Sequence, residues 1–149
     1  MTKRLSSRRR RDLNKKINLK NLIYKNSPVF AFLWATIIFA LCATPGQFIP
    51  SANWLELLSF DKWVHASMFF ILCSLLFLVV LKYDLSKLWM IMFFVSGVLY
   101  GGLLEIMQAQ CFTNRSADWQ DFVANSFGCV VAILVFKKLK KTFVNSVIN

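Results

Sequence analysis

The sequence predicts an all-α integral membrane bundle of four transmembrane helices, with both termini in the cytoplasm. Of the 149 residues, 57% are hydrophobic and 15 are phenylalanine, whereas a soluble domain would be about 45–50% apolar. The apolar residues form long blocks rather than spaced stripes. The net charge of +11 is concentrated toward the two ends of the chain.

Four segments are candidates for membrane spans, since a spanning helix needs about 17–25 apolar residues. They are residues 28–44, 63–81, 88–108 and 122–136. The last segment is short and becomes a full span if its first turn starts near Trp119. The link at 82–87 is short enough to join antiparallel neighbours. The first segment is longer than the apolar core of a signal peptide, so we expect a retained helix.

Lysine and arginine near the helix ends predict the orientation, because cytoplasmic loops carry an excess of both. Residues 1–27 hold ten of them, 82–87 two and 137–149 four, whereas 45–62 and 109–121 hold one each. We therefore expect a basic cytoplasmic tail at 1–27, a membrane domain at 28–136 and a basic cytoplasmic tail at 137–149. The N-terminal tail should bind anionic lipid. Without a recognisable nucleic-acid motif, no nucleic-acid partner is expected.

Polar residues outside the tails fall at the predicted outer ends of three helices. Asp61 and His65 begin the second helix, Glu105 and Gln108 end the third, and Asp118, Asp121 and Asn125 lead into the fourth, with Arg115 in the loop between. The spacing within each helix places its set on one face. Charge within the apolar boundary is costly unless it is paired or hydrated. We therefore expect one polar site between these three helices.

The candidate catalytic residues are His65, Glu105, Asp61 and Asp121. Histidine suits general acid or base chemistry near neutral pH, and Asp61 is expected to orient the imidazole. No serine or cysteine nucleophile lies beside His65, so water attack or group transfer is favoured over acyl-enzyme chemistry. A single histidine with loosely spaced carboxylates argues against a metal, and no cofactor is expected.

The candidate substrate-binding residues are Arg115, Gln108, Asp118 and Asn125. Arginine can bind a phosphate or a carboxylate through two parallel hydrogen bonds. The amides of Gln108 and Asn125 would supply further hydrogen bonds.

Simpler interpretations remain open for several of these residues. Asp61 has the position of a helix N-cap, as do Asp118 and Asp121 for the last helix. Lys62 is interpreted as a side chain that snorkels to the interface. Gly97 and Gly101 have the G-x-x-x-G spacing of close helix packing, within the chain or between two copies, and Gly128 is a candidate partner surface. The four cysteines, Cys42, Cys73, Cys111 and Cys129, are interpreted as small packing residues.

Taken together, these residues resemble the VanZ-like membrane family. The family pattern is Asp-Lys-x-x-His, then Glu-x-x-Gln, then Arg-x-x-Asp-x-x-Asp-x-x-x-Asn-x-x-Gly. Residues 61–65, 105–108 and 115–128 match it in order and spacing. The resemblance implies a multi-pass protein of the bacterial cytoplasmic membrane with a role at the cell envelope. The family is named after an accessory protein of glycopeptide resistance, which is linked to teicoplanin.

Three functions are considered. The first is an intramembrane enzyme that acts on an envelope lipid or glycan at the outer leaflet. The second is a non-catalytic lipid-binding, antibiotic-binding or transport protein. The third is a structural polar cluster. Interhelical polar contacts average only about 0.6 kcal/mol, so a cluster with this many charged residues is larger than helix packing alone requires. The sequence does not indicate an oligomeric state.

Overall fold

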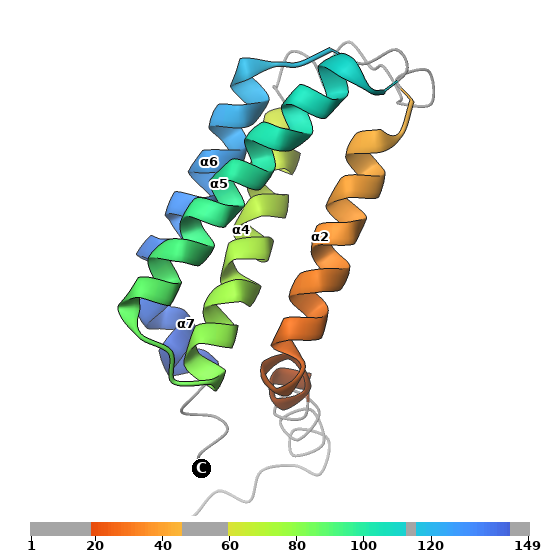
Figure 1. The fold of residues 1–149 in the computed structure, drawn as a ribbon. Helices are drawn as coiled ribbons and strands as arrows, with labels where there is room; N and C mark the ends of the chain where they lie inside the picture. The colour runs from red at the N-terminus through yellow and green to blue at the C-terminus, as the bar shows by residue number, and fades with distance from the viewer. Residues whose placement is uncertain (1–18, 46–59, 113–115, 144–149) are drawn as a thin grey trace, which may run out of the picture.

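The computed structural model describes residues 19–45, 60–112 and 116–143, which form helices joined by turns (Figure 1). A short helix, Leu19–Lys25, precedes the labelled helices. These are α2 (Ser27–Ala43), α4 (Phe60–Lys82), α5 (Lys87–Gln110), α6 (Trp119–Leu134) and α7 (Phe136–Phe143). The predicted all-α class is confirmed for the described residues, and α2, α4, α5 and α6 each begin and end within three residues of an expected span.

Length separates these four helices into two groups. Both α4 and α5 are long and apolar enough to cross a membrane on their own. The 17 residues of α2 and the 16 of α6 correspond to roughly 26 and 24 Å, less than the hydrocarbon core of about 30 Å. Each reaches the necessary length only together with the short helix bent against it, by 82° for Leu19–Lys25 and by 56° for α7.

The central helix of the bundle is α4, which packs against α2, α5 and α6 (Figure 1). Its Phe69 and Phe77 are fully buried, and they belong to a core that includes Ile38 of α2, Leu104 of α5 and Cys129 of α6. This shared core fixes the rotation of α4 about its axis, and thereby decides which residues of its first turns face α6.

Two hydrogen bonds attach α2 to its neighbours. The indole Nε1 of Trp34 donates to the Met68 carbonyl of α4 at 2.9 Å. The Tyr100 hydroxyl of α5 donates to the Ala35 carbonyl of α2 at 2.8 Å. Both use a side chain that is largely apolar with one polar end, which suits a helix interface in lipid.

Glycine allows α6 to approach α4 closely. A Cβ atom on Gly128 would lie 2.1 Å from the Ala66 carbonyl oxygen, far inside contact distance. Gly97 and Gly101 of α5 face Cys129 and Asn125 of α6. The G-x-x-x-G stripe therefore packs within the chain, and Gly101 leaves room for the Asn125 side chain.

The two ends of the bundle differ in character. The start of α4, the end of α5 and the start of α6 lie together at the top of Figure 1. The 82–87 link and α7 lie at the other end, and both terminal segments expected as basic tails include a helix there, Leu19–Lys25 and α7. The expected site residues belong to the top end.

Candidate functional site

Lys62 lies at the centre of the outer part of the site. Its Nζ contacts carboxylate oxygens of Asp118 at 2.5 Å, Asp121 at 2.6 Å and Asp61 at 2.9 Å. The Lys62 side chain is only 21% exposed. The Lys62 ammonium group therefore has carboxylate partners within the bundle, because the rotation of α4 directs it at the first turn of α6.

The first turn of α6 places two of these carboxylates. Asp118 is the N-cap, and its Oδ1 accepts a hydrogen bond from the Gln120 amide at 2.8 Å. Asp121 follows in the first turn, where the helix dipole favours negative charge. Asp118 thus acts as a helix cap and as a partner of Lys62. The hydrogen bond from Lys62 lowers the pKa of the Asp118 carboxyl below its ordinary value.

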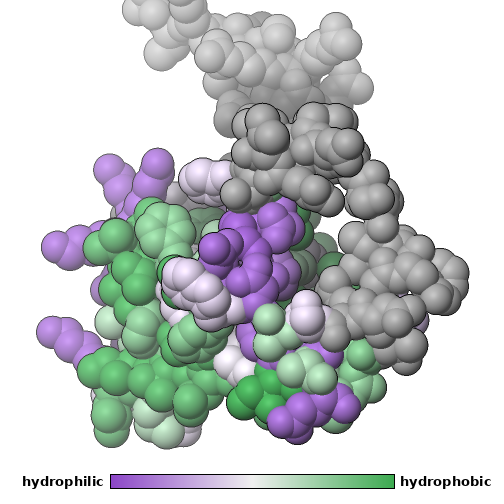
Figure 2. Space-filling model, turned by 90° about the horizontal axis from the view of Figure 1, so that it is seen from above, coloured by the Kyte–Doolittle hydropathy of each residue, from purple (hydrophilic) through white to green (hydrophobic). Residues whose placement is uncertain are grey.

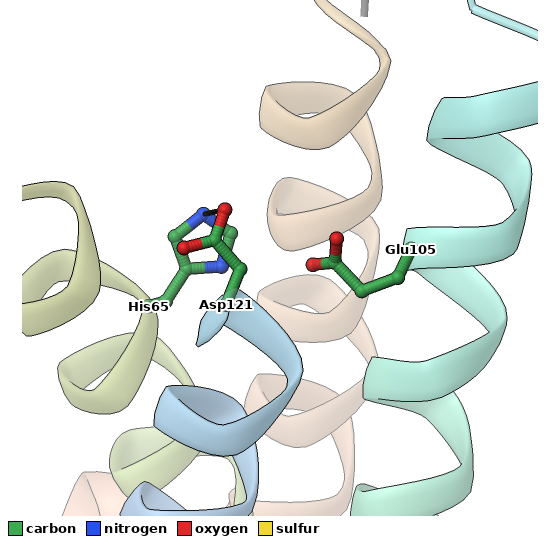
Figure 3. A group of neighbouring side chains, drawn as sticks. All are labelled: His65, Glu105 and Asp121. Atoms are coloured by element: carbon green, nitrogen blue, oxygen red, sulfur yellow. Dashed lines mark ion pairs between the residues drawn. The ribbon is translucent and has the colours of Figure 1, made fainter. Parts of the chain in front are cut away.

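His65, Glu105 and Asp121 form the inner part of the site. They come from α4, α5 and α6 and point toward one another (Figure 3). One ligand-type atom from each lies within 4.8 Å of the other two. The His65 side chain is 11% exposed and Glu105 is 6% exposed. These three residues are therefore largely withdrawn from solvent.

The inner groups are held by specific contacts. His65 Nδ1 lies 3.1 Å from Asn125 Oδ1, and Asn125 is 1% exposed. His65 Nε2 faces Asp121 Oδ2 at 3.8 Å. Glu105 Oε2 accepts a hydrogen bond from the Asp118 backbone amide at 3.2 Å. Asp121 joins the two parts, since Oδ1 contacts Lys62 while Oδ2 faces His65.

We call these seven residues, Asp61, Lys62, His65, Glu105, Asp118, Asp121 and Asn125, the polar cluster. Two of the eight expected site residues, Asp61 and Gln108, have contacts other than those expected. Asp61 pairs with Lys62 and is 57% exposed, and it is Asn125 that contacts the imidazole. Gln108 donates to the Cys42 carbonyl of α2 at 3.3 Å, because α5 contacts α2 as well as α6. Arg115 lies outside the described residues.

The polar cluster opens beside an apolar groove. Figure 2, which looks onto the top end, shows hydrophilic residues gathered at the middle of the face with hydrophobic residues beside them. A groove of about 350 Å³ between α4 and α6 is lined by Lys62, Trp63, Trp119 and Ala124 among others. A second hollow of about 160 Å³ shares Trp63, Ala66 and Phe127 with it and reaches Gly128. An apolar furrow therefore runs from Lys62 along the α4–α6 seam.

The arrangement combines groups with distinct chemical capacities. The His65 imidazole can donate or accept a proton, and its surroundings are shielded enough to strengthen electrostatic interactions. Glu105 and Asp121 bring two carboxylates to the inner part, beside the imidazole of His65. These groups together could bind a cation.

Comparison with known proteins adds no relative. No family model, curated protein or solved structure matches this chain. Functional inference therefore rests on the fold and on the geometry of the polar cluster.

Proposed function

We propose that the chain is a VanZ-like, multi-pass protein of a bacterial cytoplasmic membrane that acts on an envelope lipid or glycan at its extracytoplasmic face. The observation that carries this proposal is the meeting of polar side chains from α4, α5 and α6 at one end of the bundle, directly above an apolar furrow. A lipid has the same two-part character, a polar head group and an apolar chain.

The proposed topology has four spans with both termini in the cytoplasm. Among the described residues, the end opposite the polar cluster carries Lys20, Lys25, Lys82, Lys87, Lys137, Lys138, Lys140 and Lys141. The cluster end carries Lys62 among those residues, and Lys62 is paired with carboxylates. Such a bias supports an extracytoplasmic position for the polar cluster. The bent basic helix α7 suits the anionic surface of the cytoplasmic leaflet.

The furrow supports a lipid as the ligand. Its two hollows are lined mainly by aromatic and aliphatic side chains of α4 and α6. An acyl or polyprenyl chain lying there would place its head group next to Lys62 and Asp121. This geometry allows a substrate to enter sideways from the bilayer.

Catalysis is the first candidate activity. His65 would transfer a proton to or from the reacting head group or an attacking water. Asn125 would keep the imidazole in one orientation, and the Lys62 ammonium would hold Asp121 in place. The second candidate, a non-catalytic lipid-binding protein, would use the same furrow and head-group position without proton transfer.

A structural role is less well supported. Among the described residues, three carboxylates surround the one ammonium group of Lys62, and like charges close together are destabilising in a low dielectric. A cluster selected for helix packing alone would be expected to balance its charge.

The test compares cells that lack the protein with cells in which it is restored. Wild type, His65→Gln, Asp121→Asn and the control Ser126→Ala are expressed, and lipids and lipid-linked glycans are profiled by mass spectrometry. Ser126 is a matched control because it lies on α6 and hydrogen-bonds only its own helix, to the Phe122 carbonyl, among the described residues. We expect wild type and Ser126→Ala to restore the profile, and the two cluster variants to accumulate without restoring it.

The other outcomes contradict the proposal in different ways. Identical profiles with and without the protein would exclude catalysis on an envelope lipid or glycan and leave the binding role. Loss of both cluster variants from the membrane, with Ser126→Ala retained, would favour the structural role.

A further inference from the structure

We infer that His65, Glu105 and Asp121 form a binding site for one divalent metal ion of the Zn²⁺ or Mn²⁺ type. One imidazole and two carboxylates from three different helices converge on one point (Figure 3). Zn²⁺ in catalytic sites is held by three protein ligands, drawn from histidine, cysteine and carboxylate side chains, with a fourth position open. Mn²⁺ also accepts this mixture of nitrogen and oxygen ligands.

The spacing suits an ion better than a direct contact. Ligands about 2.1 Å from a tetrahedral ion lie roughly 3.4 Å apart. His65 Nε2 and Asp121 Oδ2 are 3.8 Å apart, too far for a hydrogen bond. All three ligand atoms lie within 4.8 Å of one another. Small side-chain movements would therefore close the three groups around an ion.

The histidine tautomer provides a second, independent indication. Asn125 Oδ1 faces His65 Nδ1 at 3.1 Å, and as an acceptor it requires the proton to be on Nδ1. A neutral ring then presents its lone pair at Nε2, the nitrogen that faces Asp121. Metal-binding histidines usually donate their other ring N–H to an oxygen acceptor in this way. Asn125 is 1% exposed, and its Nδ2 has no hydrogen-bond partner among the described residues.

The carboxylate ligands are supported as well. Lys62 contacts Asp121 through Oδ1 and leaves Oδ2 directed at the site. The Asp118 amide donates to Glu105 Oε2. Ligating carboxylates are commonly held by such outer contacts.

An ion would also add positive charge to the inner part of the site. Glu105 and Asp121 bring two carboxylates there, and carboxylates repel an anionic head group. A divalent cation beside Lys62 would offset this repulsion and offer a phosphate oxygen a direct ligand position. The inference deepens the proposed function by naming an ion in the same site, but metal binding is measured without reference to lipid.

The experiment uses the full chain purified in detergent, stripped with a chelator and reloaded with Zn²⁺ or Mn²⁺. After desalting, we expect about one ion per chain by mass spectrometry of the metal, together with a higher unfolding temperature. His65→Gln, Glu105→Gln and Asp121→Asn should each lose the ion. Asn125→Leu should weaken binding by about 10–100-fold, whereas Asn125→Asp, which keeps an acceptor for Nδ1, should retain it.

Two controls separate this site from others. Asp61→Asn removes a carboxylate of the polar cluster outside the three ligands, and Cys111→Ser removes an exposed thiol. Both should retain the ion. Wild type loaded with Co²⁺ should give the visible spectrum of nitrogen and oxygen ligands, a measurement that holds even if a ligand variant fails to fold.

Less than about 0.1 ion per chain in wild type, an ion retained by folded Asp121→Asn, or a thiolate charge-transfer band with Co²⁺ would each overturn the inference. Its failure is distinguishable from that of the proposed function. If the purified protein binds the ion but deleting the protein leaves envelope lipids unchanged, the metal site stands and the proposed function fails. If the protein binds no ion but its deletion changes those lipids, the proposed function stands and the metal site fails.

Discussion

Replacing Gly128 with alanine should destabilise the bundle by separating α6 from α4. The new Cβ would lie 2.1 Å from the Ala66 carbonyl oxygen and 2.9 Å from the Phe70 amide nitrogen. Both are backbone atoms, so no side chain can rotate away. The helices would have to move apart by about 1 Å to restore contact distance, and a gap of that size forfeits up to about half of the dispersion energy of a contact.

The expected cost follows from two opposing terms. Overpacking a close helix interface costs about 1–3 kcal/mol, and sometimes more, while alanine regains up to about 1 kcal/mol of helix propensity over glycine. Because α4 and α6 share the largest interface between described helices, we place the cost at the upper end, with a net loss of about 2 kcal/mol. Equilibrium unfolding of the purified protein in detergent measures this loss.

Gly102→Ala is the matched control. There the Cβ would meet the Phe122 ring edge at 3.3 Å, and that side chain is 37% exposed and can adjust. We expect a change within about 0.5 kcal/mol, or a slight gain from helix propensity. Equal unfolding free energies for Gly128→Ala and Gly102→Ala would refute the packing described for α4 and α6.

Three further predictions concern the polar cluster and its orientation. Lys62→Met should lower the free energy of unfolding by about 1–3 kcal/mol, less than the roughly 3–5 kcal/mol of a broken, fully buried pair, because Lys62 is partly exposed. Lys62→Arg keeps the positive charge and should lower it less. Equal unfolding free energies for wild type and Lys62→Met would contradict the ion-pair network. Because pairing lowers the pKa of Asp118, its contribution to stability is present above the ordinary aspartate pKa of about 3.9 and is lost as pH falls through the lower folded value. Below about pH 4, the unfolding free energy of wild type should therefore fall more steeply with pH than that of Asp118→Asn. Parallel curves of unfolding free energy against pH would show that the Asp118 ion pair does not stabilise the fold. Topology is tested with two single-cysteine proteins, one that keeps only Cys111 and one that carries only Ser86→Cys, with the remaining cysteines replaced by serine. An impermeant thiol reagent added to intact cells should label the first protein but not the second. The reverse pattern would invert the proposed topology.

Local sequence features predict the helices well, because hydrophobic blocks and helix caps act over short distances. The expected start of the last span near Trp119 agrees with α6, for which Asp118 is the N-cap. The bends that follow α6 and precede α2 could not be derived in this way. They arise where apolar sequence ends and basic residues begin, and hydropathy alone gives no angle.

The polar cluster was predicted in its location but only partly in its contacts. Neighbouring positions on a helix differ by about 100°, so the rotation of α4 decides whether Asp61 or Lys62 faces α6. That rotation is set by the buried core. Similarly, Glu105 and Gln108 share a broad face of α5, but one contacts α6 and the other contacts α2. Sequence spacing identifies a face, whereas the neighbour of each residue depends on how three helices pack.

The most direct test of the central claim is photocrosslinking at the furrow in living cells. A photoreactive amino acid replaces Ala124, which lines the groove beside Lys62, and another replaces Val130, an exposed residue of the same helix that lines neither hollow. We predict that the Ala124 probe captures one class of envelope lipid, identified by mass spectrometry, and that the Val130 probe captures bulk phospholipid. The same mixture of bulk lipids at both positions would contradict a lipid site at the polar cluster.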